Sequence, residues 1–158
     1  MRINTVQSML FRQLREVCEQ RKAERSRNGR GAGCAMISGE KAARFATDWI
    51  AAWNARDLGR ILACYAEGFE MSSPKIVQFL GEASGALRGK EAVGSYWRRA
   101  LELRPDLHFR LLGVFPGERS VCIRYESLDG QNAVEWFEFN DDFLVRRAEA
   151  YYGSAREQ

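Results

Sequence analysis

The residue with the clearest potential for chemistry is Glu135, an acid set among aromatic residues. Glu135 alternates with Phe137 and Phe139, and side chains two residues apart point to the same face of a strand. Burial on such an apolar face raises the pKa of a carboxyl group well above its ordinary value. Glu135 could then act as a general base near neutral pH, or stay protonated and donate a hydrogen bond. A structural acid paired with an arginine is the alternative, and the sequence leaves both open.

Two further polar residues were considered as reactive groups. His108, the only histidine, shares its strand phase with Arg110 and opposes apolar neighbours, so we expect it to face solvent. Ser73 has no histidine nearby in the sequence that could activate it as a nucleophile. A Ser/His/Asp arrangement is therefore not expected, although Ser73 could bind a ligand.

Metals and nucleotide cofactors find no support in the sequence motifs. The four cysteines, Cys18, Cys34, Cys64 and Cys122, include no closely spaced pair, and one histidine completes few zinc sites. The glycine-rich segment 29–33 lacks the structural context of a dinucleotide-binding fingerprint. The glycine-rich segment 84–91 lacks the residues of a phosphate-binding loop. We expect no cofactor, no metal, and cysteines kept as reduced thiols in the cytoplasm.

The charge of the chain is concentrated near its beginning. Residues 1–38 carry eight basic and three acidic side chains, a net charge of +5, so the total of +3 leaves −2 for residues 39–158. We expect residues 1–38 to be a basic tail, disordered or loosely helical, and translation could begin at Met36. A nucleic-acid-binding domain carries its basic residues on the fold itself, so no nucleic-acid partner is expected.

No segment has the properties of a membrane span or of a secretory signal. Apolar runs stay well below the roughly 20 residues that cross a bilayer, and Arg12, Arg15 and Glu16 interrupt the first one. With 158 residues, 46% of them hydrophobic, the chain is long enough for one domain with a sizeable core. We assign residues 39–153 to that domain and residues 154–158 to a C-terminal tail.

Helical periodicity appears first in the domain and strand patterns follow. Ser38 and Asp57 are predicted N-caps of two helices, and a third helix is expected from about residue 90 to residue 103. A short strand at 69–72 ends at Pro74, and residues 74–88 are expected to form a long loop over the site. Four strands joined by short turns, at 107–115, 120–127, 133–139 and 144–152, predict an antiparallel meander. The fold class is therefore α+β, with three helices on a strongly curved antiparallel sheet around a pocket.

The combination of several short segments resembles a known superfamily. They are WIAAWNARDL at 49–58, YAEGF at 65–69, Pro74, LRGKEA at 87–92, EWFEFN at 135–140, and a last strand closing on YYG at 151–153. Their order is similar to that of nuclear transport factor 2-like proteins, in the SnoaL-like branch, over about residues 40–153. The resemblance implies a cone-shaped roll with a deep, mostly apolar pocket. The superfamily includes isomerases, cyclases, hydrolases and non-catalytic modules, so the fold alone leaves function open.

The ketosteroid isomerases of this superfamily provide a residue-by-residue comparison. The position of their general-base carboxylate corresponds to Ser73, and that of their oxyanion-hole tyrosine to Trp49. Their second donor, a buried acid, corresponds to Glu135, the only role kept in kind. Steroid isomerisation by that route is therefore not expected. The polyketide cyclases of the superfamily also place an acid on an inner strand, and Glu135 could match that acid.

The resemblance also implies which residues line the pocket. Beside Glu135, the candidate acid/base, we expect a lining formed by Trp49, Trp53, Tyr65, Met71, Ser73, Trp97, Phe109, Tyr125, Phe137 and Tyr151. The tyrosine hydroxyls among them could orient a ligand oxygen. Two functions are kept: a module that binds a small hydrophobic molecule, and a cofactor-free isomerase, cyclase or hydrolase that uses Glu135. We also expect a homodimer formed through the sheet, with the outward-facing Trp136 near its centre.

Overall fold

The structure is a computed structural model that describes residues 36–153. The expectations for residues 1–35 and for the C-terminal tail lie outside the described residues. Four α-helices and six strands follow one another within this range. They are α2 (Gly39–Asn54), α3 (Leu58–Ala63), β1 (Tyr65–Ser72), α4 (Pro74–Leu80), β2 (Ala86–Arg88), α5 (Gly89–Leu103), β3 (Arg110–Pro116), β4 (Ser120–Glu126), β5 (Asn132–Phe139) and β6 (Val145–Tyr152).

The first two helices begin where the sequence predicts. The Ser38 hydroxyl accepts a hydrogen bond from the Lys41 amide at 3.2 Å, and the Asp57 carboxylate accepts one from the Arg60 amide at 2.9 Å. Each bond satisfies one of the amides that a helix leaves unpaired at its N-terminus. Both caps are therefore confirmed, and no helix within residues 36–153 is long and apolar enough to cross a membrane.

The segment 74–88 is not the loop that we expected. Ser73 caps α4, Pro74 occupies its first turn, and Gly81 ends it in the left-handed conformation with φ of 69°. Proline is well suited to the first position of a helix because its missing N–H would have no partner there. Pro74, expected to end the strand, therefore begins α4, which makes four helices instead of three. The short strand β2 then returns along β1.

The six-stranded sheet has the order β2-β1-β6-β5-β4-β3. All neighbouring strands are antiparallel except β1 and β6, which are parallel. The expectation of an antiparallel sheet is therefore correct for the meander β3–β6 and wrong for this one pair. A short 3₁₀ helix, Leu128–Gly130, joins β4 to β5, so this connection is longer than the two-residue turn that the Asp-Gly pair at 129–130 would favour.

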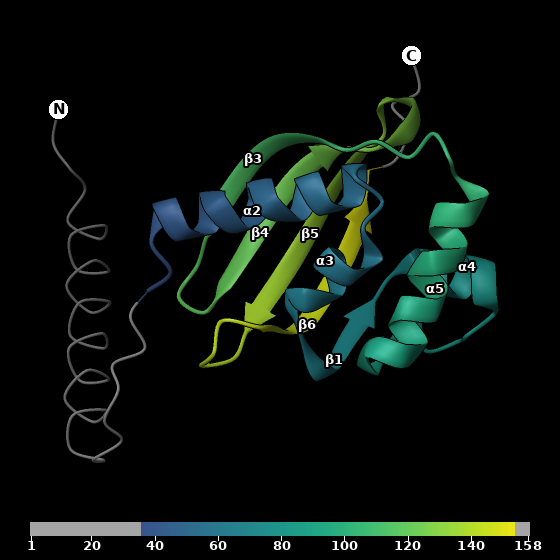
Figure 1. The fold of residues 1–158 in the computed structure, drawn as a ribbon, viewed down its shortest axis with the longest axis horizontal. Coiled ribbons are helices and arrows are strands. Elements are labelled where there is room, and N and C mark those ends of the chain that lie inside the picture. Colours follow the sequence, from purple (N-terminus) through teal and green to yellow (C-terminus); the bar gives the residue numbers. More distant parts are fainter. Residues whose placement is uncertain (1–35, 154–158) are drawn as a thin grey trace, which may run out of the picture. The chain divides into compact units, whose positions relative to one another are not determined.

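Helix α2 lies across the inner face of the meander (Figure 1) and contributes seven buried residues to the core. The indole of Trp49 contacts the rings of Trp53, Phe109, Tyr125 and Phe137, with ring centroids 5.4–5.9 Å apart. Such aromatic pairs add about 0.5–1.5 kcal/mol each beyond the area they bury. The result is an aromatic core between one helix and the sheet, in the α+β arrangement that the sequence predicts.

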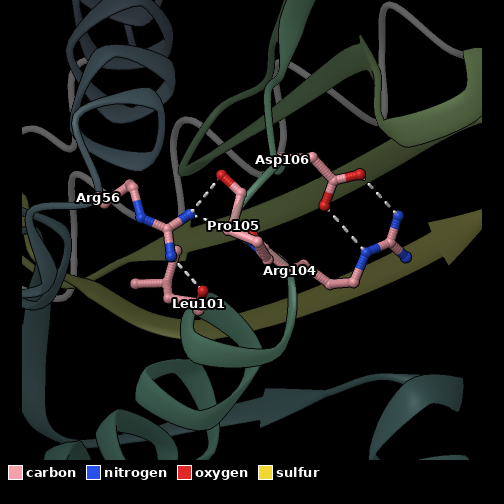
Figure 2. Close-up of polar contacts among 5 residues, drawn as sticks. All are labelled: Arg56, Leu101, Arg104, Pro105 and Asp106. Atoms are coloured by element: carbon pink, nitrogen blue, oxygen red, sulfur yellow. Dashed lines mark hydrogen bonds and ion pairs between the residues drawn. The ribbon is translucent and has the colours of Figure 1, made fainter.

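Arg56 ties the turn after α2 to the end of α5 (Figure 2). Its guanidinium donates hydrogen bonds to the carbonyl oxygens of Arg104 at 3.1 Å, of Pro105 at 3.3 Å, and of Leu101. These carbonyls lie at the C-terminus of a helix, where partners within the helix are missing. Arg56 thus fixes the segment that leads from α5 into β3, and this segment forms one side of the site described next.

Candidate functional site

A cavity of about 90 Å³ opens between α2, α4, α5 and the inner face of the sheet. Most of its wall is aromatic or aliphatic, and its polar groups converge from five strands and helices: α4, α5, β4, β5 and β6. The lining residues are Trp49, Trp53, Met71, Ser73, Lys75, Tyr96, Trp97, Ala100, Leu107, Phe109, Tyr125, Ser127, Glu135 and Tyr152. This combination of an apolar wall and a few placed polar groups is typical of small-molecule sites.

Glu135 is the only acid on the cavity wall. It lies on β5 with its neighbours Ile123 and Ala150 on the flanking strands, and it is 3% exposed. Burial raises the pKa of its carboxyl from 4.5 to about 7, and the opposing effects of Tyr125 and Lys75 are smaller. The Tyr125 hydroxyl donates a hydrogen bond to Oε2 at 3.2 Å. Near neutral pH this carboxyl can therefore both accept and release a proton.

Trp49 and Tyr65 form a hydrogen-bonded pair next to the cavity. The indole Nε1 of Trp49 donates to the Tyr65 hydroxyl at 3.0 Å. Burial, together with the nearby charge of Glu135, raises the pKa of Tyr65 well above 10.0. The donor at the position of the isomerase oxyanion-hole tyrosine is therefore already used inside the protein.

Lys75 is a polar residue of the wall that the sequence analysis missed. It lies in the first turn of α4, with its ammonium 4.0 Å from the centroid of the Tyr152 ring. Burial, and then the charge of Arg104, lower the pKa of this amine, while Glu135 acts in the opposite direction. Residues 74–88 were expected to form a loop over the site, and without the helix α4 no single residue of that segment was predicted to line the cavity.

Three hydroxyl groups gather near the same end of the cavity. Ser73 is 4% exposed, and its Oγ accepts a hydrogen bond from the Lys75 amide at 3.2 Å. Burial raises the pKa of Tyr96 to about 12 and also raises that of Tyr152, and in each case a hydrogen bond with Ser73 partly offsets the effect of burial. Both phenols stay protonated over the physiological range, so they can donate hydrogen bonds to a ligand.

One buried donor of the wall lacks a partner within the described range. The indole Nε1 of Trp53 is buried and forms no hydrogen bond with any group of residues 36–153. An unsatisfied buried donor costs about 1–3 kcal/mol. A ligand oxygen bound in this cavity could remove that cost.

Of the predicted lining residues, most are on the cavity wall, two are buried in the core, and Tyr151 is exposed on the outer face. Trp49, Trp53, Met71, Ser73, Trp97, Phe109, Tyr125 and Glu135 are on the cavity wall. Tyr65 and Phe137 are fully buried in the core and do not line the cavity.

The prediction for Tyr151 is wrong. Tyr151 pairs with Val134 on the outer face and is 49% exposed, whereas Tyr152 lines the cavity. Ala148, Ala150 and Tyr152 share the inner face of β6 because they alternate along it. The alternation of the two alanines with Tyr152 was the signal that would have identified the correct tyrosine.

The remaining charged residues considered in the sequence lie away from the cavity. His108 and Arg110 are exposed, as expected, and Arg124 is exposed as well. Arg110 pairs with Glu126 at 2.8 Å, and Arg124 donates to the Asn132 side chain at 3.2 Å. Neither arginine therefore neutralises Glu135, so the structure disfavours the alternative of an arginine-paired acid. In the described part of the chain, no three His, Cys, Asp or Glu side chains group together as metal ligands.

The fold and the site define a roll with a small, aromatic, internal cavity, and comparison with protein families gives this class its name. The model of the SnoaL-like domain matches residues 46–147, more than half of the chain. The chain therefore belongs to the SnoaL-like family. No match to a curated protein was found.

Solved structures support the same assignment. A SnoaL-like protein of unknown function from Burkholderia thailandensis E264 is 51% identical, with 75% of this chain and 99% of that chain covered and a TM-score of 0.74. A nuclear transport factor 2-like protein of unknown function from Cytophaga hutchinsonii ATCC 33406 is 13% identical, with 75% and 93% covered and a TM-score of 0.55. A candidate isomerase of the SnoaL-like family from Agrobacterium tumefaciens str. C58 is 15% identical, with 72% and 97% covered and a TM-score of 0.58. The last two share the fold.

Proposed function

We propose that this protein binds a small, largely apolar molecule in the cavity and that Glu135 transfers a proton to or from it. The observation that carries the proposal is the state of Glu135: a carboxyl 3% exposed on an aromatic wall, with its pKa raised to about 7 by burial. A general acid–base group is most effective when its pKa lies near the working pH. A protein of the same fold from Agrobacterium tumefaciens str. C58 carries the name of a candidate isomerase, and that name is compatible with the proposal.

The geometry favours proton transfer within one substrate. Ionised Glu135 takes a proton from a carbon next to a carbonyl group, which leaves an enolate, and in a substrate with a conjugated double bond the protonated acid returns the proton to the far carbon of that system. The atoms and charges balance within the substrate, and Glu135 ends as it began. The hydroxyls of Tyr96 and Tyr152 are on the same wall and can donate hydrogen bonds to the enolate oxygen, where negative charge develops.

A binding module without chemistry is the second candidate, and Ser73 is the observation that favours it. Ser73 lies where the ketosteroid isomerases carry their general base, and its hydroxyl already caps α4. On this view the cavity is a receptor, and Glu135 affects the affinity for the ligand and no reaction rate.

The test separates binding from chemistry. Native mass spectrometry would identify a molecule captured by the full chain, and NMR in deuterated water would then follow exchange of its carbon-bound hydrogens. We expect the wild type to accelerate exchange and Glu135→Gln to abolish it, while affinity stays within about tenfold. If the wild type captures a molecule and exchanges none of its hydrogens, the catalytic proposal is wrong and the receptor is supported.

A further inference from the structure

We infer that the ligand of this cavity is a small carboxylate, with its anionic group paired to the Lys75 ammonium and its apolar part against the tryptophans. The inference rests on the proposed function only in taking this cavity as the ligand site. It adds the charge and size of the ligand, and it holds whether or not Glu135 performs chemistry.

The charges on the cavity wall favour an anion. Lys75 and Glu135 are the only ionisable acid and amine among the lining residues. Lys75 has no ion pair within residues 36–153, and the one described contact of its ammonium is with the face of the Tyr152 ring. Below about pH 7 the carboxyl of Glu135 is mostly protonated, so the Lys75 ammonium gives the wall a net positive charge there. A half-buried ammonium is stabilised by an anion bound beside it.

The hydrogen-bonding groups point to the same chemistry. The hydroxyls of Ser73, Tyr96 and Tyr152 lie on the wall with Lys75, and the Trp53 Nε1 has no partner in the described range. Lysine and tryptophan side chains are donors only, and a protonated Glu135 offers a further donor. Donors thus outnumber acceptors, and a carboxylate, which only accepts, complements them with charge-assisted hydrogen bonds.

The volume of the cavity limits the size of this ligand. A cavity of about 90 Å³ is well below the roughly 300–1,000 Å³ of pockets for drug-sized ligands, which favours a small ligand. Beside its carboxylate group, such a ligand has a short carbon chain or a small branched group. The wall that receives this group is formed by Trp49, Trp53, Trp97 and Phe109.

Binding should depend on pH through Glu135. The groups that face it from the surrounding elements are Tyr65 on β1, Lys75 on α4, Tyr96 on α5, Tyr125 on β4 and Tyr152 on β6. The four tyrosines are uncharged near neutrality, and the ammonium attracts the ligand. Ionisation of Glu135 above about pH 7 places a second negative charge in the cavity, so carboxylate affinity should fall as the pH rises.

The test uses 3-methylbutanoate and 3-methylbutanamide, which have the same number of non-hydrogen atoms and differ in charge. Ligand-observed NMR titrations with the full chain at about pH 6 would give both affinities. We expect the carboxylate to bind about tenfold more tightly than the amide, and Lys75→Met to remove the preference. Lys41→Met is the matched control, because the Lys41 ammonium also lies over a ring, that of Phe143 at 3.7 Å, away from the cavity wall.

The outcomes separate this inference from the proposed function. Equal affinity for the two probes, no measurable binding of the carboxylate, or a preference that survives Lys75→Met would overturn the inference. Glu135→Gln should keep the preference for the carboxylate and lose its pH dependence. Failure of Glu135 to exchange hydrogens leaves all of these binding results unchanged, so it bears only on catalysis.

Discussion

At the residue scale, Glu135 is held where its charged form is unfavourable. The carboxyl is surrounded by aromatic side chains and receives one hydrogen bond, from Tyr125 at 3.2 Å. That bond and the charge of Lys75 lower the pKa of Glu135, but burial has the larger effect and the result is about 7. A buried carboxyl with so little compensation costs stability when it ionises. Such costs are typical of sites that are kept for binding or catalysis.

The pH dependence of folding follows from this pKa. The folded protein keeps a proton on Glu135 up to about pH 7, whereas the ordinary pKa is 4.5. Between these values the folded state binds the proton more tightly, so its stabilising effect is complete below the lower value and is lost as the pH rises through the upper one. The loss is on the order of 3 kcal/mol, at about 1.4 kcal/mol per pH unit.

Urea unfolding at about pH 5 and pH 8 would measure this dependence. Wild type should be less stable at the higher pH, and Glu135→Gln should remove most of the difference because glutamine does not ionise. Glu138→Gln is the control, since Glu138 lies on the same strand but on the outer face, paired with Arg146. Equal pH dependence in wild type and Glu135→Gln would contradict a raised pKa for Glu135.

The sequence located Glu135 but not Lys75, and the reason is physical. Strict alternation along β5 puts Glu135 on the same face as Phe137 and Phe139, so its burial could be predicted from neighbours in the sequence. Lys75 reaches the cavity wall where its ammonium lies 4.0 Å from the Tyr152 ring, a contact between segments distant in the chain. The hydrophobic periodicity of a seven-residue helix such as α4 does not reveal such a contact.

At the element scale, Asn54 joins the end of α2 to the beginning of the meander. Its Nδ2 donates to the Phe109 carbonyl at 2.8 Å, and its Oδ1 accepts from the Phe109 amide at 2.7 Å. The side-chain amide thus pairs with both backbone groups of one residue, as a neighbouring strand would. This pairing positions Phe109, whose ring stacks on Trp49 at 5.9 Å in the cavity wall.

Replacing Asn54 by alanine should destabilise the fold. Both backbone groups of Phe109 would lose their partner, which costs about 1–3 kcal/mol for a part-buried pair. Chemical denaturation would measure the change, with Asn132→Ala as the control, because Asn132 is exposed and its side chain accepts a bond only from Arg124. A loss no greater for Asn54→Ala than for the control would show that the pairing is not needed.

The elements themselves were predicted to different degrees. The caps of α2 and α3 are local features, and they were readable because Ser38 and Asp57 act on amides three residues away. The parallel pairing of β1 with β6 could not be predicted from the sequence. It depends on which strand edge remains open after the meander has formed, and the residues of β1 do not specify that.

At the scale of the whole molecule, the outer face of the sheet carries more apolar surface than a solvent-facing sheet needs. Trp136 lies there beside Cys122 on β4, and Tyr151 and Phe115 are 49% and 59% exposed. Arg147 lies 5.8 Å from the Trp136 ring and covers part of it. We propose that two copies of the chain associate through this face, because aromatic residues are enriched in the cores of interfaces.

Sedimentation at micromolar concentration tests this proposal. We expect the wild type to be a dimer and Trp136→Asp to be a monomer, because a buried carboxylate without a partner opposes association. Phe79→Asp is the control: Phe79 is 62% exposed on α4, away from the outer sheet face, and its replacement should leave the dimer intact. A monomeric wild type would rule the dimer out.

The most direct test of Glu135 as a buried acid with a raised pKa is a titration of this residue itself. The side-chain carboxyl carbon would be followed by NMR from acid to alkaline pH, with its signal assigned by its absence from Glu135→Gln. The environment of Glu135 predicts a titration midpoint near the raised pKa of about 7. It also predicts a higher midpoint in Tyr125→Phe, which loses the hydrogen bond that lowers the pKa. A midpoint near the ordinary value of 4.5 would contradict a buried acid poised for proton transfer.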